Sequence, residues 1–63
     1  MALYRCFFLD SNNHIIGPPE IIEADDEAVA IDLAQRLCDE NPDCRHIELW
    51  DAARRVRRLD RAI

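Results

Sequence analysis

The sequence predicts an α+β domain of the ββαββ type, with a four-stranded, mainly antiparallel sheet and one helix packed on one face. Two observations carry this prediction. Apolar residues recur at the spacing of one helical face between residues 25 and 38. Short segments rich in β-branched and aromatic residues lie on both sides of that helix. Because 63 residues are too few for two domains, residues 1–63 form a single small domain.

The first strand is predicted at residues 2–9, which are rich in aromatic and branched side chains. Side chains alternate along a strand, so the segment has two faces. One face holds Tyr4, Cys6 and Phe8. The other holds Leu3, Arg5, Phe7 and Leu9. The Asp, Ser and Asn residues at 10–13 favour a turn, because they accept left-handed backbone geometry and bond to their own main chain.

The second strand is predicted to begin at residues 14–16 and to continue extended through residues 20–23. Residues 17–19, Gly-Pro-Pro, interrupt it. Proline has no amide hydrogen to donate to a neighbouring strand, so this segment cannot lie in the middle of a sheet. We therefore expect it at an edge.

The helix is predicted over residues 25–38. Its buried stripe consists of Ala30, Leu33, Ala34, Leu37 and Cys38. Asp25 is the expected N-cap, because its carboxylate can accept bonds from first-turn amides. Asn41 and Pro42 should end the helix, since proline disfavours helical geometry in the residue before it.

Residues 45–50 alternate with a period of two and predict the third strand, with Ile47 and Leu49 on one face and Trp50 on the other. A turn is expected at residues 51–54 and a fourth strand at residues 55–59, with Val56 pointing inward. The tail, residues 60–63, is expected to fray. The first strand is the most apolar and should be central, which gives the spatial order 2-1-3-4.

The charge pattern excludes some classes of partner. The net charge is −5, which disfavours non-specific binding to nucleic acid or to an anionic membrane. Residues 20–43 hold nine carboxylates and one arginine, whereas residues 54–61 hold five arginines and one aspartate. No stretch approaches the roughly 20 apolar residues of a membrane span. We expect no membrane association.

The chain has three cysteines, an odd number, and no stretch before Leu3 resembles a secretory signal. Reduced thiols and a cytoplasmic location are therefore expected. Cys38, Cys44 and His46 follow a C-x5-C-x-H spacing, but zinc sites use tighter pairs such as C-x2-C. We expect no metal or other cofactor, with Cys6 and Cys38 in the core and Cys44 exposed on a loop.

A single helix covers only one face of the sheet, so the other face is the candidate interaction surface. Its predicted residues are Arg5, Phe7, Leu9, Trp50, Arg55 and Arg57. Large apolar groups framed by charge on an open sheet are typical of a protein interface. We expect a protein-interaction or homodimerisation module. The competing interpretations are that the Pro-Pro segment or the C-terminal tail folds over these side chains, or that the two faces of the sheet are reversed.

Nucleic-acid binding is the alternative function, because arginines on a β-ribbon can contact phosphates and base edges. The arginine-rich hairpin at residues 54–58 would carry it. Two observations argue against this function. The net charge is acidic, and Trp50 is the one aromatic residue in that region on which a base could stack. Catalysis is not expected: there is no nucleophile elbow, and the chain's single glycine excludes a Gly-rich phosphate loop.

Several short motifs resemble a set of short alphaproteobacterial proteins of unknown function. They are Tyr4-Arg5 with Phe8-Leu9-Asp10, His14-Ile15 with residues 17–23 (GPPEIIE), Asp26-Glu27 with Ile31, and residues 47–51 (IELWD) with Arg54-Arg55-Val56. The resemblance covers nearly the whole chain and implies a bacterial, cytoplasmic, compact domain. It supplies no catalytic residue or ligand. Ala52 and Ala53 stand where a glycine would be expected in the last turn.

Overall fold

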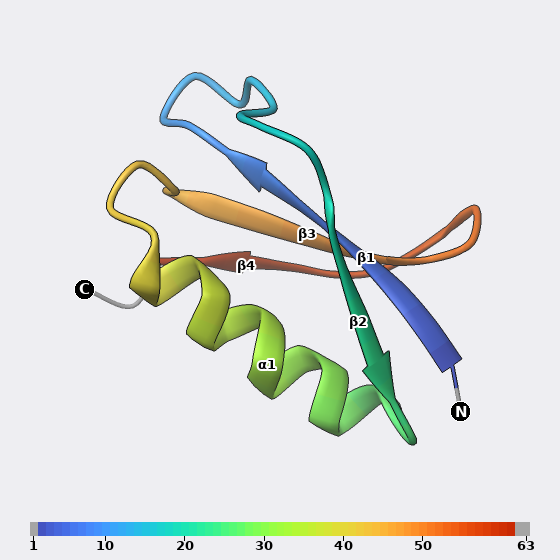
Figure 1. Ribbon diagram of the computed structural model, residues 1–63. Helices are drawn as coiled ribbons and strands as arrows, with labels where there is room; N and C mark the ends of the chain where they lie inside the picture. Colours follow the sequence, from blue (N-terminus) through green and yellow to red (C-terminus); the bar gives the residue numbers. More distant parts are fainter. Residues whose placement is uncertain (1, 62–63) are drawn as a thin grey trace.

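The computed structural model describes residues 2–61 and confirms the ββαββ architecture (Figure 1). Its elements are β1 (Ala2–Leu9), β2 (Glu20–Ala24), α1 (Glu27–Glu40), β3 (His46–Asp51) and β4 (Arg54–Asp60). The strands form one antiparallel sheet in the order β2-β1-β3-β4, as predicted. In this order β1 and β3 are the central strands. The helix covers one face of the sheet.

The second strand begins later than predicted. β2 starts at Glu20, after the prolines, and the segment at residues 14–16 contributes only one isolated bridge, between Leu9 and Ile15. Gly17 turns the backbone with φ +71°, a conformation that glycine adopts without steric cost. The two prolines that follow cannot donate to β1. Strand pairing therefore resumes only at Glu20, which lies opposite Cys6.

The helix N-cap is Asp26 rather than the predicted Asp25. Asp26 has an extended backbone, and its Oδ1 accepts a hydrogen bond of 2.9 Å from the amide of Val29. An N-cap side chain accepts from an amide two or three residues after it, and Val29 stands three residues after Asp26 but four after Asp25. The helix ends at Glu40 with Asn41 as C-cap, in agreement with the predicted stop.

The core lies between the helix and the sheet. Ala30, Ala34 and Cys38 form the fully buried line of the helix, and their small side chains let it lie close to the strands. Leu33 and Leu37 are half-buried and pack at its edge. On the sheet side the predicted alternation is confirmed, because the buried side chains include Tyr4, Cys6, Ile22, Ile47 and Leu49.

A β-bulge changes the alternation in β4. Leu49 lies opposite Arg57 and Trp50 lies opposite Arg55, so Val56 is an extra residue with no partner of its own. Val56 and Leu59 both pack against the core although they are three residues apart. In a regular strand, residues with this separation would point to opposite faces. The inward position predicted for Val56 is confirmed, and Leu59 also points towards the core.

Asp60 and Arg61, the first two residues of the predicted tail, are anchored and do not fray. Asp60 belongs to β4, and the Arg61 amide donates to the Arg45 carbonyl at 2.9 Å. The Arg61 guanidinium donates to the carbonyls of Cys38, Asp39, Asn41 and Cys44. These carbonyls stand at and just after the end of the helix, where backbone acceptors lack helical partners. Residues 62–63 of the predicted tail lie outside the described residues.

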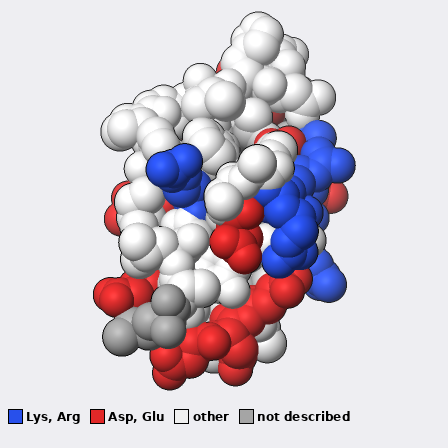
Figure 2. All heavy atoms as spheres, turned by 90° about the vertical axis from the view of Figure 1, so that its right-hand side faces the viewer, with Lys and Arg blue, Asp and Glu red and all other residues white. Residues whose placement is uncertain are grey.

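Charge is unevenly distributed over the surface. Seen from the side of the β3–β4 turn, most of the basic surface lies on the right flank, a smaller basic area lies left of the centre, and carboxylates gather at the lower end (Figure 2). Arg54 lies 3.6 Å from Asp51 and 4.0 Å from Glu27. Both pairs are exposed to solvent and are worth at most about 1 kcal/mol each. No helix within residues 2–61 is long and apolar enough to cross a membrane.

Candidate interaction surface

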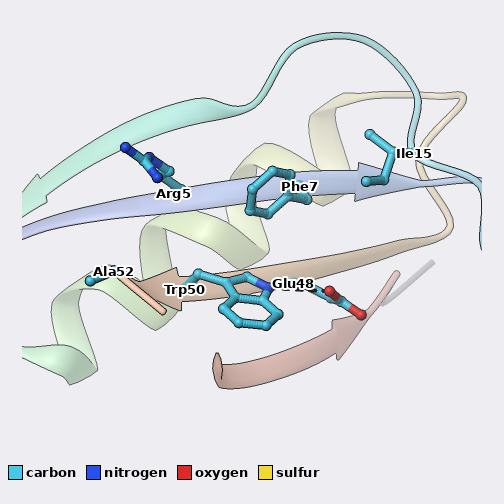
Figure 3. A pocket seen from close by; sticks show the side chains of 6 residues that line it. All are labelled: Arg5, Phe7, Ile15, Glu48, Trp50 and Ala52. Carbon is cyan, nitrogen blue, oxygen red and sulfur yellow. Dashed lines mark hydrogen bonds between the residues drawn. The ribbon is translucent and has the colours of Figure 1, made fainter. Parts of the chain in front are cut away.

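The face of the sheet away from the helix contains a shallow hollow of about 230 Å³ (Figure 3). Two central strands supply most of its lining, with Arg5 and Phe7 from β1 and Glu48 and Trp50 from β3. Ile15, from the loop after β1, and Ala52, from the β3–β4 turn, complete it. In Figure 3 these side chains stand in front of the strands while the helix lies behind them.

The two aromatic rings of this hollow are held in a fixed arrangement. The centroids of Phe7 and Trp50 lie 6.5 Å apart, with the ring planes at 88°, the edge-to-face geometry that aromatic pairs favour. The Trp50 indole Nε1 donates to Glu48 Oε1 at 3.1 Å. Glu48 Oε2 in turn lies 3.6 Å from the Arg55 guanidinium. The aromatic surface is therefore ordered before any partner arrives.

A second hollow, lined by Leu3, Arg5, Ile21, Asp51 and Ala52, lies next to the first and shares Arg5 and Ala52 with it. The exposed large hydrophobic residues of the described chain include three that line these two hollows, Leu3 and Ile21 in the second and Ile15 in the first. Leu3 is 63% exposed, Ile15 61% and Ile21 54%. Together the two hollows form one surface, here called the open face. It consists of Leu3, Arg5, Phe7, Ile15, Ile21, Glu48, Trp50, Asp51 and Ala52.

Three of the six predicted interaction residues, Arg5, Phe7 and Trp50, line the open face. Arg55 lies beside it, opposite Trp50 and paired with Glu48. Leu9 differs from the expectation, because it is only 5% exposed. The loop after β1 curls back along the end of this strand: Ile15 bridges to Leu9, and the Ile16 amide donates to the Phe8 carbonyl at 2.8 Å.

The bulge moves the arginines of β4 relative to the open face. Arg57 lies in register with Leu49, a residue of the helix-covered face, and Arg58 instead lies opposite Glu48. Arg58 donates to Asn13 Oδ1 at 2.6 Å. Sequence alternation alone placed Arg57 on the open face, and nothing in the residue pattern of β4 signals the extra residue at position 56.

Sequence reasoning selected neither the aliphatic residues of the open face nor Ala52. The alternation of β1 did place Leu3 on this side. Ile21 could have been found from the pair Ile21-Ile22, because one of two adjacent strand residues must point away from the core. Ile22 is buried and Ile21 exposed. The position of Ile15 depends on the fold of the loop, for which the sequence offers no comparable signal.

All three cysteines are free thiols without exposed surface. This corrects the expectation that Cys44 is exposed on its loop. Burial raises the pKa of Cys6 and the pKa of Cys38 to about 12 each, because a thiolate is poorly solvated in the core. Cys38 Sγ lies 3.2 Å from Cys44 Sγ. Among residues 2–61, no group of three or more His, Cys, Asp or Glu residues could hold a metal ion.

His46, the third member of the C-x5-C-x-H spacing, has a different partner. Its Nδ1 lies 2.7 Å from Asp60 Oδ1 in the neighbouring strand, and the two residues are in register. The Cys44 thiol contacts the His46 carbonyl oxygen at 3.0 Å and not its imidazole. The spacing therefore brings the backbone of His46, rather than a ligating ring nitrogen, to the cysteines.

Comparison of the chain with protein-family models, with curated proteins and with solved structures gave no match.

Proposed function

We propose that this protein is a non-catalytic homodimerisation module in which two copies pack open face against open face. The observation that carries the proposal is the exposure of Leu3, Ile15 and Ile21 around the half-buried Phe7 and Trp50. Apolar side chains gathered in this way on a small domain gain free energy by leaving water, at about 25 cal/mol per Å².

The size of the face supports a second copy as the partner. The Cα atoms of the protein extend over 31 × 22 × 16 Å. A rectangle over the two longer dimensions has an area of roughly 700 Å², so the sheet face as a whole is of the size, about 800 Å² per partner, that a specific interface buries. A domain of this size also buries little surface on its own, so a dimer would add to its stability.

The charges of this side also suit a two-fold interface. Arg5 lines both hollows of the open face and has no ion pair with any residue in the described range 2–61. Glu23 lies opposite Leu3 on β2, on the same side of the sheet, and is likewise exposed. In a symmetric dimer the same patch meets itself, so Arg5 of one copy can pair with an acidic side chain of the other.

The sheet edges are less suitable for association than the face. β4 presents Arg54, Arg55, Arg57 and Arg58 along its length, and a second copy of this edge would repel it. β2 is only five residues long and follows two prolines. Short strands, prolines and charged side chains are the features that discourage edge-to-edge pairing.

The proposal includes a bacterial, cytoplasmic setting. The three free thiols support this location, since cytoplasmic reductants keep cysteines reduced. The bacterial origin depends on the resemblance to short alphaproteobacterial proteins.

Sedimentation equilibrium of the protein over a range of concentrations up to high micromolar tests the dimer. We expect the wild type to fit a monomer–dimer equilibrium and Ile21→Glu to remain monomeric, because it places a charge in the apolar interface. Val29→Glu is the matched control, since Val29 is also exposed (47%) but lies on the helix. A wild-type monomer at every concentration refutes the proposal, and dissociation by Val29→Glu but not by Ile21→Glu would refute the open face as the interface.

Single-stranded nucleic acid is the second candidate partner for the same surface. The observation that favours it is the arrangement of Arg5 and Arg55 beside the rings of Phe7 and Trp50, since bases stack on aromatic side chains and guanidinium groups bind phosphates. Trp50 is the chain's only tryptophan, so its fluorescence reports on this site. Quenching by a single-stranded oligonucleotide at low salt, lost in Arg5→Glu, would support this candidate over the dimer.

A further inference from the structure

Two of the three thiols are in direct contact. Cys38 lies in the last turn of α1, and Cys44 lies in the loop that leads into β3. Their Sγ atoms are 3.2 Å apart, and both side chains are fully buried. The third thiol, Cys6, lies on β1.

The backbone on both sides of this contact is fixed by the same group. The Arg61 guanidinium donates to the carbonyl of Cys38 and to the carbonyl of Cys44, each at 3.2 Å. Within the connecting loop, the Asn41 amide donates to the Cys38 carbonyl at 3.3 Å, and the Cys44 amide donates to the Asn41 carbonyl at 3.1 Å. The distance between the two sulfurs is therefore set by a hydrogen-bonded loop.

We propose that Cys38 and Cys44 form a reversible disulfide that ties the end of the helix to the start of β3. The sulfurs must approach from 3.2 Å to the bonded distance of about 2.05 Å, a shift that side-chain rotation and a small loop movement can supply. The oxidant belongs to the class of small-molecule disulfides, such as oxidised glutathione.

The reaction proceeds by two thiol–disulfide exchanges. The thiolate of one cysteine attacks a sulfur of the small disulfide, forms a mixed disulfide and releases one small thiolate. The thiolate of the second cysteine then attacks the protein sulfur of that mixed disulfide and releases the second small thiolate. In total, the two protein thiols lose two electrons and two protons, and the small disulfide is reduced to two thiols.

Burial determines how fast this exchange can proceed. Only the thiolate attacks a disulfide, and burial together with the hydrogen bond from Cys44 raises the pKa of Cys38 to about 12. Neither sulfur has exposed surface. Oxidation therefore requires the loop at residues 41–45 to open, and Arg61, which holds carbonyls of this loop and of the helix end, is the positioning residue that limits the opening.

The bond would close a ring of seven residues at the end of the helix. This site lies among the core residues between helix and sheet, away from the open face. The disulfide is consequently independent of the proposed dimer, and monomeric Ile21→Glu should form it as well.

A redox titration tests the proposal. The protein is equilibrated in glutathione buffers of varied composition, folded in one series and unfolded in concentrated urea in another. The samples are then quenched, alkylated and analysed by intact mass and peptide mapping. Because the fold holds the two sulfurs together, we expect the folded chain to form the Cys38–Cys44 bond at a GSH²/GSSG ratio at least about tenfold higher than the unfolded chain requires.

Variants separate the proposed bond from other oxidation products. Cys6→Ala should keep the tenfold shift, whereas Cys44→Ala should leave no intramolecular disulfide. Arg61→Ala should speed oxidation of the folded chain, while Arg58→Ala should not. Equal midpoints for the folded and unfolded chains would overturn the proposal, as would a bond that includes Cys6 or a folded chain that accumulates only mixed glutathione disulfides.

Discussion

Replacing Ala52 by glycine should stabilise this protein. Ala52 is the first residue of the two-residue turn between β3 and β4, and its backbone adopts φ +53°. For residues with a side chain, this left-handed conformation costs roughly 1–2 kcal/mol, because Cβ approaches the carbonyl oxygen that follows. Glycine removes that cost and adopts positive φ readily.

The net gain is smaller than the strain relieved. Glycine is more flexible in the unfolded chain, and this entropy offsets about 0.4–1 kcal/mol. With mid-range values for both effects, the expected stabilisation is about 0.8 kcal/mol, or about 3–6 °C in Tm if 1 kcal/mol corresponds to about 4–8 °C for a domain of this size. Urea denaturation followed by circular dichroism measures it.

Ala53→Gly is the matched control, because Ala53 is the other residue of the turn and its φ is not positive. It should lose stability, since glycine adds unfolded-state entropy there without relieving strain. Both substitutions should be measured in monomeric Ile21→Glu as well, because Ala52 lines the open face. If Ala52→Gly destabilises the protein as much as Ala53→Gly does, then the turn strain inferred from φ is wrong.

Three further predictions concern the helix ends and the thiols. Asp26→Ala should cost about 1 kcal/mol of stability in urea denaturation through loss of the N-cap bond to Val29, and Asp25→Ala should cost less. Arg61→Ala should cost about 1.5–3 kcal/mol in the same assay, because it leaves carbonyls at the end of α1 without their charged donor. Alkaline titration should show stability falling as pH rises from about 9 towards 12: the unfolded chain then ionises Cys6 and Cys38 while the folded chain keeps them protonated. A Cys6→Ala/Cys38→Ala variant should reduce this slope.

Period and composition were sufficient to predict the sheet order and a large part of the core. The aromatic, branched character of β1 identified a central strand, and the alternation in β3 identified Ile47 and Leu49 as buried. These signals are strong because a strand with one buried face needs an apolar side chain at every second position.

The differences between prediction and structure come from single-residue events. The N-cap moved from Asp25 to Asp26, two residues with the same side chain, so that only the geometry of the first turn could distinguish them. Arg57 and Arg58 exchanged places because one bulge residue shifts all that follow. Leu9 and Cys44 are buried by loop conformations, which depend on long-range contacts such as those of Arg61 rather than on periodicity.

The extra residue in β4 also makes this strand tolerant of a change in length. Removing Val56 would leave Trp50 opposite Arg55 and Leu49 opposite Arg57, so that every remaining pair in the hairpin would keep its register. The same deletion within β1 would turn all following side chains towards the wrong face. A version of this chain that is one residue shorter at position 56 should therefore keep the fold and lose only one apolar contact with the core.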